Sequence, residues 1–416
     1  MQSNMKYVII GNSAAAIGAV QGIREYDKDG QIVIISNESY HTYSRPLISY
    51  WLEGKVTEEK MRYRNADFYE KNNIDTLFDT TVTSIDSDKK EIVIQNGNRI
   101  SYDKLLVATG SRPFVPPMDG LDSVEKKFTF MSYDDAKALK AALFDGAKVL
   151  IIGAGLIGLK AAEAMQHMNV KMTVIDLADR ILPSILDADA SAIMQSYIEN
   201  KGVKFILNTS VSKFSKNNAV LKTGESVDFD VLILAVGVRP NTSLISEAGG
   251  NVNRGIITDL TQMTTLRNVY AAGDCTESHD ISSDTDKILA LLPNAFMQGE
   301  VAGKNMAGKS FYYLNAIPMN AIGFFGLHII TAGSYEGEAY VEKDGENYKK
   351  LVIKDNKLTG YILMGDVQRA GIYTSLIKER IELGNVDFEM LKKRPQMMAF
   401  NKVRRLEKLG GVYVED

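Results

Sequence analysis

The chain has 416 residues, of which 45% are hydrophobic and 24% are charged, and its formal net charge is −4. This composition is typical of a globular protein too long for one ordinary domain, so we expect two or three packed domains. The slightly acidic balance and the lack of a recognisable nucleic-acid-binding motif argue against nucleic acid as a partner. No apolar run approaches the ~20 residues that a membrane span needs, so no span is predicted.

The N-terminal residues, the single cysteine and the spacing of the histidines restrict the possible classes of protein further. Residues 1–5 lack the charged and apolar regions of a signal peptide, which predicts a cytoplasmic protein. The single cysteine, Cys275, excludes a disulfide within the chain and a Cys-x-x-Cys pair. The four histidines have no metal-ligand spacing, so no metal site is predicted.

The first elements follow a strand–helix–strand order. We expect a strand over 7–10, a helix over 13–26 and a strand over 31–35. The turn after the first strand reads Gly11-x-Ser13-x-x-Ala16, a dinucleotide-binding turn in which serine and alanine replace two glycines. Such a turn directs backbone N–H groups at a pyrophosphate. Taken alone, this degenerate turn leaves a plain strand-to-helix connection open.

The next segment links the first nucleotide-type unit to a second. Residues 40–54 are rich in turn formers and aromatic residues, and we expect antiparallel strands over 82–85, 91–95 and 99–102, followed by a buried strand over 104–108. Pro113, Pro116 and Pro117 predict an irregular linker after this strand.

The second unit carries the stronger motif. We expect a helix over 134–143, a strand over 148–152, a helix over 156–168 and a strand over 171–175. Gly153, Gly155 and Gly158 fill all three glycine positions of the dinucleotide-binding turn. Asp176 ends the following strand, where a carboxylate accepts hydrogen bonds from a ribose 2′-hydroxyl, which favours NAD(H) over NADP(H). The nearby Arg180 leaves NADP(H) open.

The C-terminal part of the chain differs in its predicted elements from the two strand–helix–strand units. We expect strands over 231–236 and 268–272, a helix over 294–306, a hairpin of strands 348–354 and 357–364, and a helix over 370–383 that ends before Gly384.

With these motifs together, the chain resembles the FAD-containing pyridine nucleotide oxidoreductases, from Lys6 to about Leu383. The segments that carry the resemblance are Val8–Ala16, Ala108–Gly110, Gly153–Gly158 with Asp176, Val236–Pro240 and Tyr270–Asp274. The resemblance implies an α/β fold with two Rossmann-like, doubly wound, three-layer nucleotide-binding domains and a small C-terminal α+β domain. The implied boundaries are 1–118 with 243–316 for a discontinuous FAD-binding domain, 119–242 for an inserted NAD-binding domain, and 317–416 for the C-terminal domain with a basic tail.

The resemblance also implies the residues that contact the two cofactors. Those implied for FAD are Gly11, Ser13, Ala14, Ala15, Glu38, Arg45, Pro46, Val82, Ala108, Thr109, Gly110, Gly273, Asp274, Asn294 and Ala295. Those implied for NAD(H) are Gly153, Gly155, Leu156, Ile157, Gly158, Asp176, Val236 and Gly237.

Two further features narrow the expected acceptor. Tyr43–Ser49, with Leu52 and Gly54, is similar to the corresponding segment of rubredoxin reductases, of ferredoxin reductases of oxygenase systems and of nitrite reductase flavin domains. The region 317–384 resembles the C-terminal domain of NADH:rubredoxin oxidoreductases. Disulfide-reducing relatives carry one or two cysteines early in the first domain, and this chain has none there. We therefore expect hydride transfer between NAD(H) and FAD, with a small iron–sulfur protein, rubredoxin or ferredoxin, as the electron partner.

Two residues are candidates for a direct role in this transfer. By resemblance, Arg45 lies beside the flavin, where a cation stabilises the reduced ring. Lys160 stands where the family commonly has a glutamate near the nicotinamide, although a solvated helix lysine is an equal alternative.

A basic cluster near the C-terminus is a candidate docking surface for an acidic carrier, with a solvated terminal helix as the alternative. Its members are Lys392, Lys393, Arg394, Lys402, Arg404, Arg405 and Lys408. Two other functions stay open: an NADH oxidase or a reductase of disulfides or persulfides, and a flavin-bound redox sensor or scaffold.

Overall fold

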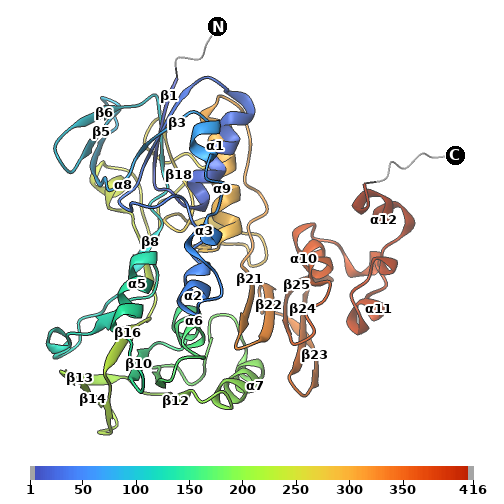
Figure 1. The fold of residues 1–416 in the computed structure, drawn as a ribbon. Coiled ribbons are helices and arrows are strands. Elements are labelled where there is room, and N and C mark those ends of the chain that lie inside the picture. Colours follow the sequence, from blue (N-terminus) through green and yellow to red (C-terminus); the bar gives the residue numbers. More distant parts are fainter. Residues whose placement is uncertain (1–4, 411–416) are drawn as a thin grey trace. The chain divides into compact units, whose positions relative to one another are not determined.

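The computed structural model describes residues 5–410 (Figure 1), so residues 1–4 and 411–416 of the first and last predicted domains lie outside the described residues. The chain divides into two compact units. The first comprises residues 1–180, 202–279 and 286–316, and the second comprises residues 181–201, 280–285 and 317–416. Over residues 5–410, no helix combines the length and the apolar character that crossing a membrane requires.

The first unit contains a parallel five-stranded sheet of order β18-β7-β1-β2-β3. Its strands are β1 (Lys6–Ile10), β2 (Gln31–Ile35), β3 (Ile74–Leu77), β7 (Lys104–Val107) and β18 (Val269–Ala271). Runs of isoleucine and valine bury both faces of the central strands, as a sheet covered on two sides requires. Because the strands are parallel, β1, β7 and β18 bring their following turns to the same edge.

Two helices, α1 (Ala14–Tyr26) and α9 (Leu292–Met306), lie side by side against this sheet (Figure 1). A Cβ on Gly299 would lie 1.9 Å from the carbonyl oxygen of Ala15, and one on Gly18 would lie 2.2 Å from that of Phe296. The two backbones therefore approach as closely as they do only because glycines face each other at the crossing.

Smaller elements complete this part of the first unit. The helices are α2 (Leu47–Leu52), α3 (Glu58–Met61), α4 (Phe68–Lys71) and α8 (Ser243–Glu247), and the strands β4 (Val82–Asp86), β5 (Glu91–Ile94) and β6 (Arg99–Ser101) form the predicted antiparallel sheet. A further short hairpin consists of β19 (Ser278–Asp280) and β20 (Thr285–Lys287), and its residues 280–285 cluster with the second unit.

A second parallel five-stranded sheet has the order β12-β11-β10-β16-β9. Its strands are β9 (Lys127–Phe128), β10 (Lys148–Ile152), β11 (Lys171–Ile175), β12 (Lys204–Ile206) and β16 (Val231–Leu234), and its helices are α5 (Tyr133–Ala142) and α6 (Leu156–Ala164). The predicted extension of α6 to residue 168 is wrong. The amide of Met165 bonds to the carbonyl of Ala162, which tightens the last turn and ends the helix.

Two short antiparallel groups accompany the second sheet. One consists of β13 (Val211–Ser215), β14 (Asn218–Leu221) and β15 (Ser226–Asp228), with the single turn η1 (Leu121–Ser123) nearby. The other pairs β8 (Ser111–Pro113) with β17 (Val238–Pro240). The linker predicted to be irregular from Pro113 onward therefore begins in a two-stranded ribbon, whose edge strands tolerate proline.

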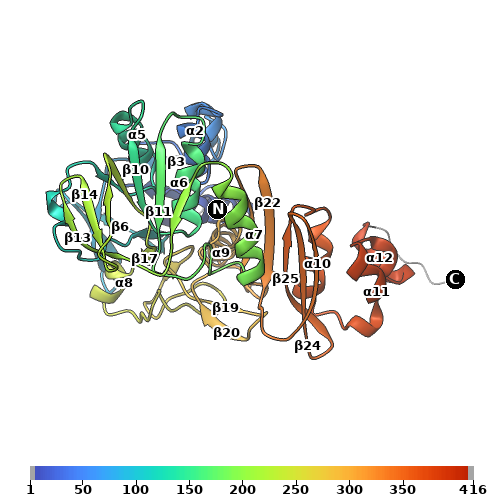
Figure 2. The ribbon, with the colours of Figure 1, turned by 90° about the horizontal axis from the view of Figure 1, so that it is seen from below.

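The second unit is built on an antiparallel five-stranded sheet of order β21-β22-β25-β24-β23 (Figure 2). Its strands are β21 (Met319–Phe324), β22 (Leu327–Gly333), β23 (Glu338–Asp344), β24 (Asn347–Lys354) and β25 (Lys357–Met364). The predicted hairpin is confirmed, because Asp355 and Asn356 join β24 to β25 with φ of 52° and 56°.

Helices of the second unit are α10 (Ala370–Lys378), α11 (Phe388–Lys393) and α12 (Lys402–Lys408), with the short turns η2 (Leu383–Asn385) and η3 (Met397–Ala399). The prediction that the helix from residue 370 continues to 383 is wrong. Arg380 adopts the left-handed region (φ 50°), so the chain leaves the helix before Ile381.

Helix α7 (Ala188–Glu199) was not predicted, and it clusters with the second unit. Asp187 caps it and accepts hydrogen bonds from the Tyr348 hydroxyl (2.7 Å) and the Lys350 ammonium (2.9 Å) on β24. The predicted domain boundaries assign Asp187 and Tyr348 to different domains, and those boundaries stay a prediction. The architecture of two parallel α/β sheets and a C-terminal antiparallel sheet confirms the predicted fold class.

Candidate functional site

The turn after β1 fits tightly between two neighbouring strand ends. Gly11 has φ of +120°, and a Cβ there would lie 2.2 Å from the carbonyl oxygen of Ala108. Its amide donates to the carbonyl of Ile35 (2.8 Å). Ser13 precedes α1 without a side-chain cap, so the first N–H groups of the helix are left to another acceptor. This is the arrangement that suits an anionic group.

Gly273, which follows β18, lies close to the start of α1. Gly273 has φ of +90°, and a Cβ there would lie 3.2 Å from the Cβ of Ala15 and 3.5 Å from that of Ala295. Its amide donates to the buried Oε1 of Gln298 at 2.7 Å. The beginnings of α1 and α9 therefore converge beside Gly273, and their positive ends add at one point.

Asp274 and Arg45 are the charged groups at this convergence. Burial raises the pKa of Asp274, and the positive charge of Arg45 opposes that rise. No hydrogen bond to the Asp274 carboxylate is found within residues 5–410. Burial also lowers the pKa of Arg45, but Tyr43, Glu38 and Asp274 outweigh this effect and raise it, so the guanidinium stays charged.

The guanidinium of Arg45 is held from three sides. It donates to the Glu38 carboxylate (2.9 Å), to the Tyr43 hydroxyl (3.2 Å) and to the carbonyl of Met131 (3.3 Å). Glu38, predicted as a cofactor ligand, therefore pairs with Arg45 in this structure. Pro46 follows at the exposed start of α2.

The other residues predicted for FAD occupy less central positions. Thr109 and Gly110 follow β7, where the Thr109 hydroxyl donates to the carbonyl of Asn241 and the Asn241 amide donates back to Thr109, both at 2.9 Å. Val82 is buried in β4, and the side chain of Asn294 accepts a hydrogen bond from the Tyr313 hydroxyl (3.0 Å). Gln298 and Asn241 are thus positioning residues that the motifs did not reveal.

The three glycines of the turn after β10 have two different roles. A Cβ on Gly153 would lie 2.3 Å from the carbonyl oxygen of Ala235, and one on Gly158 would lie 2.0 Å from that of Gly153. A Cβ on Gly155 would meet no atom within 4 Å. Gly153 and Gly158 therefore permit the fold of the turn, whereas Gly155 leaves open space at the start of α6, before Leu156 and Ile157.

The acidic residue after β11 is held against this turn. The Asp176 carboxylate accepts hydrogen bonds from the amides of Ala154 (2.6 Å) and Ala178 (2.8 Å). Arg180 pairs with the neighbouring Asp179. Val236 and Gly237 follow β16 at the same edge of the sheet, where the carbonyl of Gly237 accepts the amide of Phe114.

Lys160 is mostly shielded from solvent and paired rather than freely solvated. Its side chain is 14% exposed, it pairs with Glu163, and its ammonium lies 4.8 Å from the ring centroid of Tyr50 on α2. The solvated alternative for this lysine is therefore wrong, and Tyr50 is a partner that the sequence did not reveal.

Cys275 is fully buried behind the Gly273–Asp274 turn. Its thiol donates toward the carbonyls of Ala272 (3.4 Å) and Val107 (3.6 Å). Burial raises the pKa of this thiol to about 11, so no thiolate is available near neutral pH.

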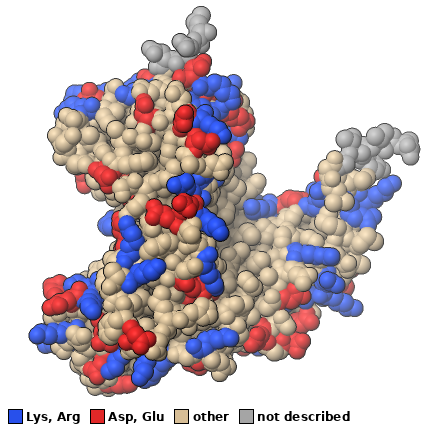
Figure 3. Space-filling view, in the orientation of Figure 1, with Lys and Arg blue, Asp and Glu red and all other residues tan. Residues whose placement is uncertain are grey.

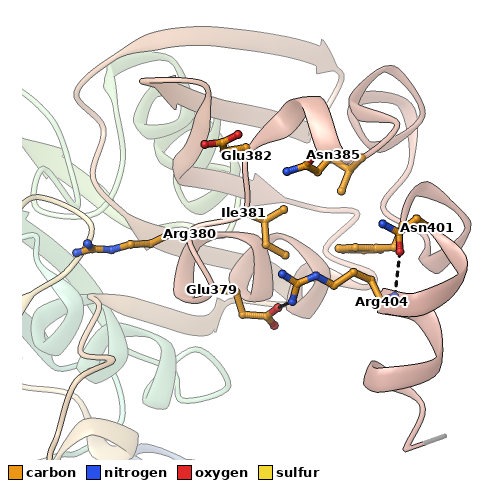
Figure 4. A pocket seen from close by; sticks show the side chains of 9 residues that line it. Glu379, Arg380, Ile381, Glu382, Asn385, Asn401 and Arg404 are labelled. Carbon is orange, nitrogen blue, oxygen red and sulfur yellow. Dashed lines mark hydrogen bonds and ion pairs between the residues drawn. The ribbon is translucent and has the colours of Figure 1, made fainter. Parts of the chain in front are cut away.

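The basic cluster of the second unit is partly neutralised. Arg404 and Lys408 both pair with Glu379, at 3.6 Å and 2.5 Å, and Lys392 pairs with Glu389. Figure 4 shows Arg404 turned toward Glu379 at a pocket of about 300 Å³. In Figure 3, Lys and Arg side chains are prominent on the surface of the C-terminal region that contains α11 and α12. Within residues 5–410, no ion pair is found for Lys393, Arg394, Lys402 or Arg405.

Comparison with known proteins identifies the family to which the chain belongs. The family model of the pyridine nucleotide-disulphide oxidoreductases matches residues 5–299. The chain belongs to this family. The model of the rubredoxin NAD⁺ reductase C-terminal domain matches residues 318–381. The chain is an oxidoreductase of this family and is similar to rubredoxin reductases.

Three known proteins show the range of similarity to this chain. The NADH-dependent phenylglyoxylate dehydrogenase subunit epsilon of Aromatoleum evansii is 30% identical over 91% of this chain and 92% of that protein. The nitrite reductase [NAD(P)H] of Bacillus subtilis is 31% identical over 90% of this chain, which spans 47% of that protein. The NADH:rubredoxin oxidoreductase of Clostridium acetobutylicum is 25% identical, with a TM-score of 0.76 over 94% of this chain and 99% of that one.

Oxidoreductases of this family bind FAD and NAD(P), and the residues described above fit both groups. Converging helix starts at Gly11 and Gly273 suit a diphosphate, and a half-buried carboxylate at Asp274 suits ribityl hydroxyls. The open space at Gly155, with Asp176 beside it, suits a second diphosphate and its ribose.

Proposed function

We propose that the protein passes electrons between NAD(H) and a small iron–sulfur carrier, rubredoxin or ferredoxin, through bound FAD. The observation that carries this proposal is the buried, protonated thiol of Cys275 in a chain with two nucleotide-binding turns. No thiol is placed to take an electron pair from the flavin. Bound FAD supplies the chemistry, since it accepts a hydride from NADH and releases electrons one at a time.

We assign one cofactor to each of the two nucleotide-binding turns. Residues 1–118 and 243–316 hold FAD, with its diphosphate at the starts of α1 and α9 and its ribityl chain at Asp274. Residues 119–242 hold NAD(H), with its diphosphate at Gly155 and its ribose at Asp176. The Asp176 carboxylate is held in place by the amides of Ala154 and Ala178, and its charge would repel the 2′-phosphate of NADP(H), which favours NAD(H).

Arg45 is proposed to stabilise the reduced, anionic flavin. Its charge is supported by Glu38, Tyr43 and Asp274, and its guanidinium lies in the segment directly before α2. A charged group fixed in advance stabilises developing negative charge without having to reorganise during the reaction.

The carrier is proposed to dock on the unpaired part of the basic cluster, Lys393, Arg394, Lys402 and Arg405. Opposite charges across an interface raise the association rate, and this effect falls with ionic strength. Charge reversal at Lys393 and Lys402 should raise the KM for the carrier and leave the KM for a small dye unchanged. Equal effects on both acceptors would remove the docking proposal.

The proposal is tested by single-turnover reoxidation. The purified protein is reduced anaerobically with NADH and mixed in a stopped-flow instrument with rubredoxin, ferredoxin, oxygen or a small disulfide. We expect the fastest flavin reoxidation with an iron–sulfur protein. Faster reoxidation by oxygen or by a disulfide would favour an oxidase or a disulfide reductase, and slow reoxidation by every acceptor would favour a redox sensor.

A further inference from the structure

Helices α2 and α6 meet where the two nucleotide-binding halves of the first unit contact each other (Figures 1 and 2). Helix α2 directly follows Arg45, and α6 begins at the open space beside Gly155. Under the proposed function, the nicotinamide and flavin rings must approach each other between these two halves. Groups at the α2–α6 contact are therefore those best placed to act on the nicotinamide ring.

The described residues of this contact include a mostly buried pair of opposite charges on α6. Lys160 and Glu163 are adjacent on one face of α6, with side chains 14% and 11% exposed. The Lys160 ammonium is turned toward α2, over the ring of Tyr50 at 4.8 Å. A tyrosine face favours a cation at this distance and keeps the ammonium at the contact. Lys160 is also one turn closer than Glu163 to the start of α6.

A second group of charges at this contact, centred on Glu53, is paired within itself. The Glu53 carboxylate accepts from the Lys55 ammonium (2.7 Å) and from the Gln166 amide (2.8 Å), and it lies 3.5 Å from His167. The Lys55 side chain is 49% exposed, and its ammonium is 5.9 Å from the same Tyr50 ring. Solvent screens Lys55 more strongly than Lys160, so the inner pair dominates the local field.

We propose that Lys160 makes the site distinguish oxidised from reduced nicotinamide by charge. The nicotinamide ring of NAD⁺ carries a positive charge, and that of NADH is neutral. The Lys160 ammonium therefore repels NAD⁺, and Glu163 moderates this repulsion. The result is weaker binding of NAD⁺ than of a neutral-ring nucleotide, which speeds product release when electrons flow from NADH to the carrier. This inference rests on the proposed binding of NAD(H) beside α6.

The test is equilibrium binding to the oxidised, FAD-loaded protein at pH 8. The two probes are NAD⁺ and tetrahydro-NAD, an analogue with an uncharged ring that does not reduce flavin. For K160M, we expect the ratio of the NAD⁺ to tetrahydro-NAD dissociation constants to fall about tenfold, the effect of a unit charge roughly 6 Å away in a partly hydrated site. For E163Q, the ratio should rise. The double variant K160M/E163Q should have a ratio below that of the parent but above that of K160M, because Lys160 lies closer than Glu163 to the start of α6 and outweighs it.

K55M is the matched control, because it removes an ammonium near the same Tyr50 ring from a solvent-exposed position. Its ratio should stay within twofold of the parent. Shifts of the same sign in K160M and E163Q, or an equal shift in K55M, would overturn the inference and leave only a packing role for the pair. If K160M does not fold, the rise in E163Q and its reversal in the double variant decide the question. Failure of NADH to bleach the flavin of the parent protein would instead count against the proposed function.

Discussion

Substitution of Gly299 by alanine should separate the two helices on which the proposed FAD site depends. The new Cβ would lie 1.9 Å from the carbonyl oxygen of Ala15, so ordinary contact requires α1 and α9 to move apart by about 1.5 Å. Such overpacking costs about 3 kcal/mol, the upper end of the usual range because two backbones must separate, whereas the gain in helix propensity is at most about 1 kcal/mol. We expect a net loss of about 2 kcal/mol, a fall in Tm of about 3 °C for a unit of this size, and reduced flavin content.

The assay compares purified G299A with the parent by thermal unfolding and by the ratio of flavin to protein absorbance. G371A is the matched control, since it introduces the same methyl group into α10, where no atom lies within 4 Å of the new Cβ. This control should be as stable as the parent or slightly more stable. The reasoning would be refuted if G299A kept the Tm and the flavin content of the parent.

Three further predictions follow from the same structure. G155A should keep the Tm of the parent but raise the KM for NADH at least tenfold, because its methyl group fills only the space proposed for a diphosphate. G153A should raise this KM and also lower the Tm, because its methyl group would meet the backbone at Ala235. Steady-state kinetics with a dye acceptor and thermal unfolding distinguish the two variants. Cys275 should resist iodoacetamide in the folded protein at pH 8 and react after unfolding, and C275S should retain turnover, as measured by mass spectrometry and NADH oxidation. D187N should be less stable than the parent at pH 7 by about 1–2 kcal/mol. Although burial raises the pKa of Asp187, hydrogen bonds from Tyr348, from a backbone amide and from Lys350 hold it below its usual value. This stabilisation exists above the unfolded pKa and disappears as the pH falls through the lower folded value, so the Tm difference should shrink below about pH 4.

The nucleotide-binding turns and central strands were predictable because local chemistry determines them. A short isoleucine- and valine-rich strand followed by Gly153-x-Gly155-x-x-Gly158 specifies a buried parallel strand and a tight turn within about ten residues. The hairpin at Asp355-Asn356 was predictable for the same reason, since both residues tolerate positive φ.

Interactions between distant segments were not predictable from such patterns. Gln298 binds the amide of Gly273, and Glu379 neutralises Arg404 and Lys408 of the basic cluster, yet neither residue stands in a recognisable motif. Helix α7 was missed because its sequence lacks a strong apolar stripe, and its position depends on Asp187 and partners more than a hundred residues away. Spacing could have revealed one long-range contact, because glycines four residues apart in α1 and in α9 permit close helix packing.

An anaerobic titration with NADH tests most directly the claim that flavin is the only redox centre between the nicotinamide and the carrier. The absorbance of bound FAD near 450 nm is followed as NADH is added to the oxidised protein in the absence of any acceptor. A chain whose only thiol is the buried Cys275 should be fully reduced by one NADH per flavin. An end point at two NADH per flavin would reveal a second two-electron centre and contradict the account.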